Sequence, residues 1–316
     1  MRNRTAVAAA VLAALLLTAG PAGAHHKPWH TRGPTTSTST STTSTSSTTS
    51  TTTTSTSTTT TSTTTTTAPS ATSKPGPGNT GPLTSDLAPM TAAQVETSMA
   101  GGRTLFERVA ITGMVRVQAP AQVVTFRNFT IDARGASYGL QNCYGVTSCS
   151  QRVVLEDGAV FNTSSAPLLA RTSTSFRATR LDLYDSDGDA VKVLGSNIVV
   201  ERSWFHDLGR GVDAHADGIQ SQTAAANVVV RSNNCDMPVR EWTPEDPYNS
   251  NACWLGPAAN VRIEGNWLNG GNYTIYCGPG IHLVNNRFGR DHRFGPIAGV
   301  CSTNSGNVWD DTGAPL

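Results

Sequence analysis

Two neighbouring polar segments contain the residues best suited to acid–base chemistry. Residues 185–192 have the sequence DSDGDAVK, and residues 213–220 have the sequence DAHADGIQ. A base placed beside the carboxylate of a uronic acid can remove a proton from the sugar, and a cation must then neutralise that carboxylate. Lys192 or His215 could be the base, and Arg210 could be the cation. This combination predicts β-elimination, the reaction of a polysaccharide lyase.

The aspartates of the same segments allow a second reaction and a metal site. A glycoside hydrolase needs two carboxyl groups, which lie about 5–5.5 Å apart in retaining enzymes. Asp189 and Asp217 would stand near this distance if they faced outward from adjacent strands, which lie about 4.8 Å apart. Asp187 could join them as a Ca²⁺ ligand, since Ca²⁺ prefers carboxylate oxygens. Aspartate before a strand also caps turns, so a purely structural role stays open.

A band of outward side chains is predicted beside these aspartates. Residues 189–193, 217–221, 251–255 and 273–277 align as short strands. The alignment turns one apolar line inward: Val191, Ile219, Cys253 and Ile275. By strand alternation, the next residues point outward: Lys192, Gln220, Trp254 and Tyr276. Aromatic faces stack on sugar rings, so this band could bind a long polysaccharide. Arg240 and Trp242, in a long loop at 236–250, would add contacts.

The elements that would position these residues form a repeat. Similar strand-like runs begin at Asn197, Asn227, Asn260 and Gly280, and looser copies begin at Val123, Arg152 and Ser175. Successive starts are between 20 and 33 residues apart. Alternation with a period of two indicates strands, and a recurring interval of this size indicates stacked coils. An antiparallel sandwich is the competing architecture, but the aligned Asn positions argue against it.

The runs follow an Asn-apolar-x-apolar-x-x-Asn-x-apolar pattern that resembles the repeats of right-handed parallel β-helix proteins of the pectate-lyase-like superfamily. The resemblance covers roughly residues 105–309. It implies an all-β fold, a right-handed parallel β-helix (a solenoid), in which equivalent side chains stack into ladders. Ser203, Asn233, Asn266 and Asn286 would form one structural ladder. A capping-box pattern at Thr91-Ala-Ala-Gln94 predicts a short N-terminal helix that covers the open end of the core.

Family motifs leave the reaction open. The polygalacturonase motifs Asn-Thr-Asp, Asp-Asp, Gly-His-Gly and Arg-Ile-Lys do not all occur in full, and no clear copy of the pectate lyase arginine motif is present. We therefore expect a polysaccharide-active protein, with uronan lyase as the first hypothesis and Ca²⁺ as a conceivable cofactor. The alternatives are a glycoside hydrolase that uses the same groove and a non-catalytic carbohydrate-binding or cell-surface β-helix.

The N-terminal region is predicted to lie outside the folded domain. Residues 1–24 have the basic, apolar and small-residue parts of a secretory signal peptide. Residues 25–34 form a tail with three histidines, and 35–82 are rich first in Ser and Thr and then in Pro and Gly, which predicts a disordered linker. The β-helix domain is then 83–316. The protein is expected to be secreted and to stay in solution or associate non-covalently with a cell wall.

Charge and cysteine content limit the partners. The formal net charge is +1, which favours neither nucleic acid nor an anionic membrane as a partner. No transmembrane segment is expected after signal cleavage, and a monomer is expected. Six cysteines in an exported chain predict disulfides, although sequence alone allows 15 connectivities. Local pairing is the simplest choice: Cys143 with Cys149, Cys235 with Cys253, and Cys277 with Cys301.

Overall fold

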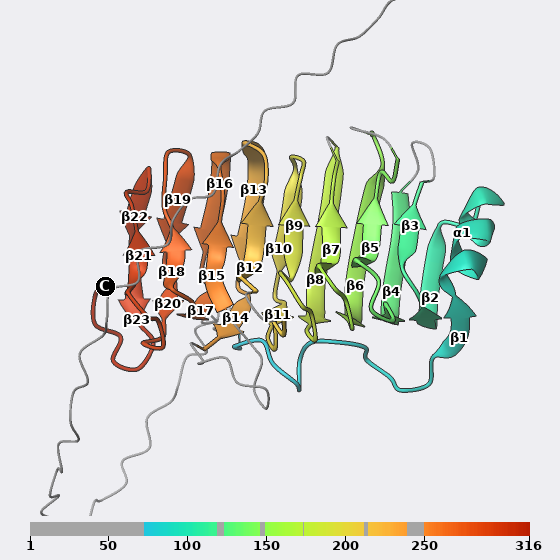
Figure 1. The fold of residues 1–316 in the computed structure, drawn as a ribbon, viewed down its shortest axis with the longest axis horizontal. Coiled ribbons are helices and arrows are strands. Elements are labelled where there is room, and N and C mark those ends of the chain that lie inside the picture. The colour runs from blue at the N-terminus through green and yellow to red at the C-terminus, as the bar shows by residue number, and fades with distance from the viewer. Residues whose placement is uncertain (1–72, 119–122, 146–148, 173, 212–213, 239–249) are drawn as a thin grey trace, which may run out of the picture. The chain divides into compact units, whose positions relative to one another are not determined.

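The structure is a computed structural model that describes residues 73–118, 123–145, 149–172, 174–211, 214–238 and 250–316. These residues form two parallel sheets that run along a stack of coils (Figure 1). All strand pairs of the two sheets are parallel, as the stacking of successive coils requires. The predicted all-β parallel β-helix is therefore confirmed.

The larger sheet has 15 strands and the smaller has eight. The larger sheet contains β1 (Ala88–Thr91), β2 (Leu105–Thr112), β4 (Val123–Asp132), β6 (Arg152–Phe161), β8 (Ser175–Leu183), β10 (Ile198–Glu201), β11 (Trp204–Phe205), β13 (Ala225–Arg231), β14 (Asn234–Met237), β16 (Ala258–Glu264), β17 (Trp267–Gly270), β19 (Ile281–Val284), β20 (Arg287–Phe288), β22 (Thr303–Ser305) and β23 (Val308–Trp309). The smaller sheet contains β3 (Val115–Val117), β5 (Tyr138–Asn142), β7 (Ala166–Ala170), β9 (Val191–Val193), β12 (Ala216–Ser221), β15 (Ser250–Leu255), β18 (Tyr273–Tyr276) and β21 (Gly295–Ala298).

Strand register reproduces the repeat that the sequence predicted. In the larger sheet Val123 pairs with Arg152, and Arg152 pairs with Ser175. Further along the stack, Val228 pairs with Ile198 on one side and with Val261 on the other. Each predicted repeat is therefore one coil. Because apolar residues recur at the same coil position, they stack into a continuous buried core.

A left-handed backbone residue bends each coil at the same place. These residues have φ between 49° and 65° and are Arg108, Asn128, Asp157, Arg180, Arg202, Ser232, Gly265, Asn285 and Gly306. In the later coils the bend separates two strands, as Arg202 does between β10 and β11. Most of these residues carry a side chain, although only glycine adopts this conformation without strain. The ladder residues follow directly after these bends.

The predicted polar ladder is confirmed and extends one coil further than expected. The backbone amide of each member donates to the side-chain oxygen of the next: Ser203 to Asn233, Asn233 to Asn266, Asn266 to Asn286, and Asn286 to Asn307, at 2.8–3.0 Å. Each asparagine also donates its Nδ2 to a strand carbonyl, as Asn266 does to Val230 at 2.9 Å. The ladder thus satisfies buried backbone groups at the bend, which is a structural role.

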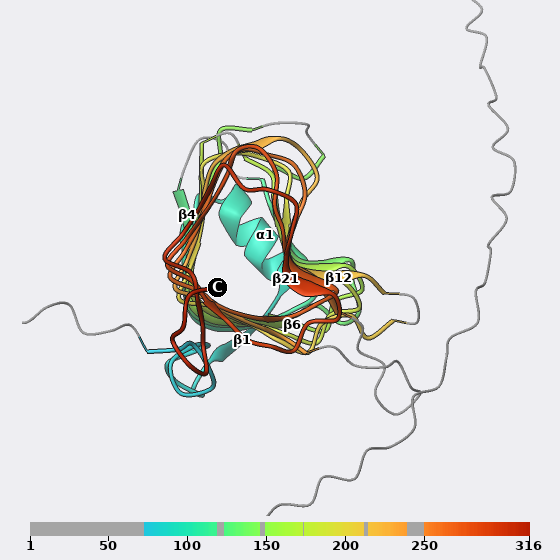
Figure 2. The same cartoon turned by 90° about the vertical axis from the view of Figure 1, so that its left-hand side faces the viewer.

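The predicted capping helix is present as α1 (Ala92–Ala100). Thr91 accepts a hydrogen bond from the backbone amide of Gln94, and the Gln94 side chain accepts one from the Thr91 amide, which completes the capping box. Val95 and Met99 join the core cluster of the β-helix. Viewed along the coil stack, α1 crosses the space that the sheets enclose (Figure 2). The helix therefore covers the first coil and removes its apolar surface from water.

The predicted linker ends earlier than expected. The described residues begin at 73, so the predicted signal peptide, the histidine-containing tail and residues 35–72 lie outside them. Residues 73–82, which were assigned to the linker, pack against the coils. Pro75 is buried, and its carbonyl accepts a hydrogen bond from Asn234 Nδ2 at 2.9 Å. The Gly81 amide donates to the Arg180 carbonyl at 3.1 Å. Residues 73–87, here called the strap, therefore run along the larger sheet towards β1 (Figure 1).

All three predicted disulfides are present: Cys143–Cys149, Cys235–Cys253 and Cys277–Cys301. The second bond links β14 to β15 and so joins the two sheets. Within the described residues, no helix is long and apolar enough to cross a membrane.

Candidate functional site

The inward line of the smaller sheet contains Trp254 where Cys253 was predicted. Ile219 pairs with Val191 on one side and with Trp254 on the other, and Trp254 pairs with Ile275. The cause is an irregularity between β12 and β15, where the register shifts after Ala216. Trp254 is therefore 1% exposed in the core, and its predicted role in substrate binding is wrong.

The outward line next to it keeps three of its four predicted members. Lys192 pairs with Gln220, and Gln220 pairs with Leu255, which occupies the place predicted for Trp254. Tyr276 follows Ile275 and so lies in the same line one coil further. All four side chains are partly exposed. We call Lys192, Gln220, Leu255 and Tyr276 the outer line.

Behind the outer line, Asp189 and Asp217 form a buried carboxyl pair. The Asp217 backbone amide donates to Asp189 Oδ1 at 2.8 Å, so the two residues stack in adjacent coils as predicted. Asp189 is 2% exposed and Asp217 is 0% exposed. The expectation that both face solvent is therefore wrong. Each side chain bends beneath the outer line, because Lys192 Nζ lies 3.1 Å from Asp189 Oδ2 and Gln220 Nε2 donates to Asp217 Oδ2 at 3.1 Å.

A second polar ladder results from these contacts. Asn251 Nδ2 donates to Asp217 Oδ1 at 3.0 Å, and Asn272 Nδ2 donates to Asn251 Oδ1 at 3.1 Å. Asp189 and Asp217 thus occupy equivalent places in adjacent coils, and so do Asn251 and Asn272. The register shift puts Asn251 one residue before Ala252, the strand partner of Asp217. This arrangement parallels the asparagine ladder of the larger sheet, except that two members are carboxyl groups.

The carboxyl pair differs electrically from an ordinary surface pair. Burial and the neighbouring Asp189 carboxyl raise the pKa of Asp217 to about 8. Burial also raises the pKa of Asp189, but the adjacent Lys192 ammonium opposes that rise. Asp217 is therefore the protonated member near neutral pH, and Asp189 carries the charge that Lys192 balances. A carboxyl group protonated at neutral pH has the form that a general acid needs.

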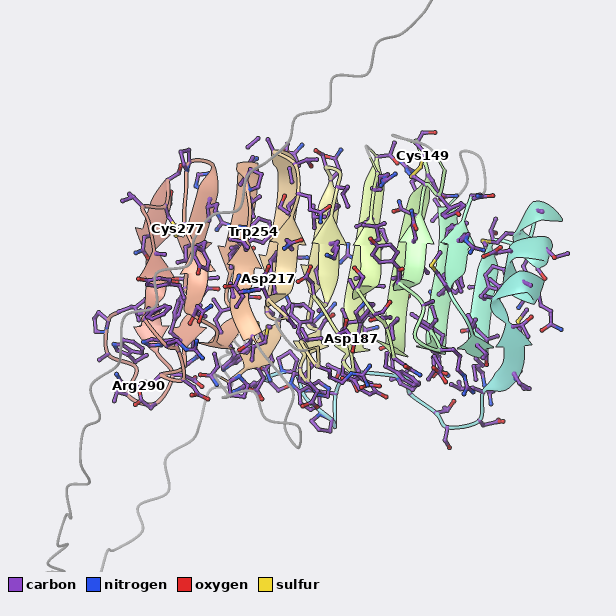
Figure 3. The ribbon with its side chains drawn as sticks, viewed as in Figure 1. Cys149, Asp187, Asp217, Trp254, Cys277 and Arg290 are labelled. Carbon is purple, nitrogen blue, oxygen red and sulfur yellow. A yellow bond between two sulfur atoms is a disulfide. The ribbon has the colours of Figure 1, made fainter. Side chains whose placement is uncertain are left out.

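Arg210 and Asp187 interact with each other and not with the carboxyl pair. The Arg210 guanidinium forms an ion pair with Asp185 and a second one with Asp187 at 3.2 Å. Arg210 is thus already neutralised, and Asp187 is engaged away from Asp217 (Figure 3). No group of three or more His, Cys, Asp or Glu side chains in the described ranges is placed to hold a metal ion. The predicted calcium set of Asp187, Asp189 and Asp217 is therefore not assembled.

The remaining predicted residues have no demonstrated place in the site. His215 precedes β12 and is exposed, and it forms no hydrogen bond or ion pair with any other described residue. Arg240 and Trp242 fall outside the described residues. The outer line and the carboxyl pair are thus the part of the prediction that the structure brings together.

An aromatic cluster at the end of the outer line was not predicted in full. The Tyr273 ring lies 5.6 Å from the Tyr276 ring and 5.6 Å from the Phe294 ring, measured between centroids. Phe294 is 62% exposed and belongs to the next coil, because Tyr273 pairs with Gly295. The spacing of 21 residues between Tyr273 and Phe294 was the available signal, since it matches one coil of the repeat. Together the three rings form a partly exposed aromatic surface, here called the platform, in which Tyr276 meets Tyr273 edge to face.

The site therefore combines the partly exposed outer line, the aromatic platform and a buried carboxyl pair on one sheet. This set can stack on sugar rings and hydrogen-bond to hydroxyl or carboxylate groups, while the acid pair lies one layer deeper. The chain matches no protein family model, no characterised protein and no solved structure.

Proposed function

We propose that the protein binds a polysaccharide across successive coils of the smaller sheet. The four residues of the outer line follow one another from coil to coil, so a chain-like ligand could contact all of them in order. The platform of Tyr273, Tyr276 and Phe294 continues this line and offers faces for sugar rings. The observation that carries the proposal is this continuity between the outer line and an exposed aromatic platform.

An extracellular location accompanies this function. Disulfides form and persist in oxidising compartments, and the protein has three of them. The signal-like sequence at 1–24 and the Ser/Thr-rich segment that follows it support secretion and a tethered or wall-associated binding domain. We place polysaccharide binding outside the cell on these grounds.

Glycoside hydrolysis at the same surface is the second candidate. The raised pKa of Asp217 supports a role as general acid, with Asp189 as the ionised partner. Binding ranks first because Asp217 is 0% exposed, and a substrate reaches it only if Gln220 moves aside. β-Elimination by Lys192 or His215 has less support, because Arg210 is already paired with Asp185 and Asp187.

The test is a panel of neutral and acidic polysaccharides, scored for binding by affinity electrophoresis and for turnover by two assays. Absorbance of the unsaturated uronate detects β-elimination, and released reducing ends without that absorbance indicate hydrolysis. We expect retardation by at least one polymer, and loss of that retardation in the variant Tyr276→Ala. Phe294→Ala should weaken retardation in the same way, whereas Asp291→Asn, an exposed change nearby in sequence, should not. Retardation by no polymer, or equal retardation of Tyr276→Ala, would contradict the proposal.

A further inference from the structure

A cavity lies on the larger sheet, where the strap meets the last coils. It has a volume of about 320 Å³. Its walls come from β17, β20, the segment after β23, and the strap, and they include Lys74, Trp267, Asn269, Arg287, Arg290 and Asp311. This volume is at the lower end of the range for small-molecule sites, about 300–1,000 Å³. It is sufficient for one or two sugar units but not for a large cofactor.

The strap covers the outer face of the larger sheet as far as Asn234, and the cavity begins one coil beyond that point. Trp204, Asn234, Trp267 and Arg287 are successive members of one outward line, because Asn234 pairs with Trp204 and with Trp267, and Trp267 pairs with Arg287. Pro75 covers the line at Asn234 through its carbonyl. One coil further, Trp267 is partly exposed and lines the cavity instead. The indole ring is therefore available to a ligand.

Lys74 is held at the cavity by a fixed turn. Asn79 Nδ2 donates to the Lys74 carbonyl at 3.1 Å and to Ser73 Oγ at 3.0 Å, and Asn79 Oδ1 accepts from the Gly76 amide at 2.8 Å. Together with the buried Pro75, these bonds fix the backbone on both sides of Lys74. Its exposed ammonium group has no carboxylate partner within the described part of the chain. Lys74 thus presents an uncompensated positive charge at the rim of the cavity.

The two arginines of the cavity are fixed but differ in how tightly they are paired. Arg290 donates to both Asp311 carboxylate oxygens, at 2.7 and 3.2 Å, and its guanidinium lies 4.2 Å from the Trp309 ring centroid. Arg287 is paired more loosely, because its Nη1 lies 3.6 Å from Asp310 Oδ1. With Lys74, the lining carries three cationic and two anionic side chains and therefore one net positive charge. Such a lining favours a ligand that has a carboxylate as well as hydroxyl groups.

From these features we propose that the cavity binds an acidic sugar unit. The sugar ring stacks on Trp267, and its carboxylate lies between the Lys74 ammonium and the Arg287 guanidinium. The sugar hydroxyls exchange hydrogen bonds with Asn269 and the Arg290–Asp311 pair. This site goes beyond the proposed function, because it lies on the other sheet and uses none of the residues of the outer line. It gives the strap a role in recognition as well as in covering the sheet.

The experiment is a calorimetric titration of the protein with a trimer of galacturonic acid, compared with the matching neutral trimer of galactose. We expect the acidic trimer to bind at least about tenfold more tightly and to lose affinity as salt concentration rises. Lys74→Met and Trp267→Ala should each weaken binding of the acidic trimer by about tenfold or more. Arg152→Met is the control, since it removes an exposed cation at the start of β6, outside both the cavity and the outer line, and should leave this affinity unchanged. Trp267→Phe keeps an aromatic ring and should retain most of the affinity.

The outcomes separate this proposal from the function proposed for the outer line. Loss of binding in Lys74→Met but not in Tyr276→Ala supports the cavity even if no polysaccharide binds the smaller sheet. Loss in Tyr276→Ala with full affinity in Lys74→Met and Trp267→Ala would overturn the cavity proposal and support the outer line. Equal affinity for acidic and neutral trimers would also overturn it, as would the absence of measurable binding by wild type.

Discussion

The backbone amide of Asp217 donates a hydrogen bond to Asp189 Oδ1 at 2.8 Å, and the two residues stack in adjacent coils with both carboxyl groups buried behind the partly exposed outer line. The arrangement keeps one proton on the pair near neutral pH, because two buried neighbouring carboxylates repel each other. Lys192 balances the remaining charge on Asp189 at 3.1 Å. The pair thus stabilises the stack of coils and also keeps a protonated carboxyl group behind the proposed binding surface.

The protonation of Asp217 predicts a specific dependence of stability on pH. Its pKa is about 8 in the folded protein, above the value of about 3.9 for an unfolded chain. The folded state therefore holds the proton more tightly, and the stability contributed by this group is full below about pH 4 and falls as the pH rises towards 8. Asp217→Asn replaces the titrating carboxyl group with an amide. The free energy of unfolding of this variant should therefore decline less between about pH 4 and 8 than that of the wild type.

Urea denaturation at several pH values between 4 and 9 checks this prediction. A one-unit difference in pKa corresponds to about 1.4 kcal/mol, so the flattening should be easily measured. Asp291→Asn changes an exposed carboxylate and should keep the wild-type slope. If Asp217→Asn has the same pH dependence as wild type, Asp217 is ionised in the folded protein and the account of the pair is wrong.

The asparagine ladder predicts a large loss of stability when one central member is removed. Asn266→Ala deprives the Asn233 amide and the Val230 carbonyl of their partners, and both groups are buried at the bend. We expect the free energy of unfolding to fall by about 2–4 kcal/mol, because unsatisfied buried polar groups cost about 1–3 kcal/mol each. Thermal and chemical denaturation measure the loss. Asn260→Ala changes an exposed side chain of β16 and should stay within about 0.5 kcal/mol of wild type, and an equal effect of both changes would contradict the ladder's role.

Substitutions of two adjacent residues of β15 should have different effects, one mainly on stability and the other mainly on binding. Trp254 is buried in the core, so Trp254→Phe should lower the free energy of unfolding by about 1–3 kcal/mol while leaving the outer surface unchanged. Leu255→Ala removes a partly exposed side chain of the outer line and should cost less than about 1 kcal/mol but weaken polysaccharide binding. Denaturation and affinity electrophoresis measure the two properties. Weaker binding in Trp254→Phe than in Leu255→Ala would place the tryptophan at the surface after all.

The bend positions predict opposite effects for a reciprocal pair of substitutions. Ser232 and Gly265 occupy equivalent bends in neighbouring coils, with φ of 54° and 62°. Ser232→Gly should raise the free energy of unfolding by about 0.5–1 kcal/mol, since glycine relieves left-handed strain. Gly265→Ala should lower it by about 1 kcal/mol through strain alone, because the nearest atom to the new methyl group would be 3.8 Å away. Changes of the same sign, measured by denaturation, would refute the strain argument.

Much of the fold was predictable because each coil repeats the same physical requirements. The runs that begin at Val123, Arg152 and Ser175 start β4, β6 and β8 at those residues, since apolar alternation defines a strand locally. The register of Trp254 was not predictable, because it depends on an irregularity after Ala216 that leaves no local pattern. The strap was missed because its Pro- and Gly-rich composition is typical of a linker, while contacts such as that of Pro75 with Asn234 join residues far apart in sequence.

The candidate site was predicted in position but only partly in character. Stacking of Asp189 on Asp217 follows from the repeat interval, and so does the outward direction of Lys192 and Gln220. Burial of the two carboxyl groups was not predictable, because it depends on how the longer side chains of the outer line fold back over them. The pairing of Arg210 with Asp185 likewise depends on a corner conformation that the repeat does not specify.

The most direct test of the central claim is a crystal structure of the protein with an oligosaccharide of the polymer selected by the panel. The account predicts ordered sugar units over successive coils, in contact with Gln220, Leu255 and Tyr276 and extending onto the platform of Tyr273 and Phe294. Sugar units bound elsewhere, with the outer line left bare at saturating oligosaccharide, would contradict it.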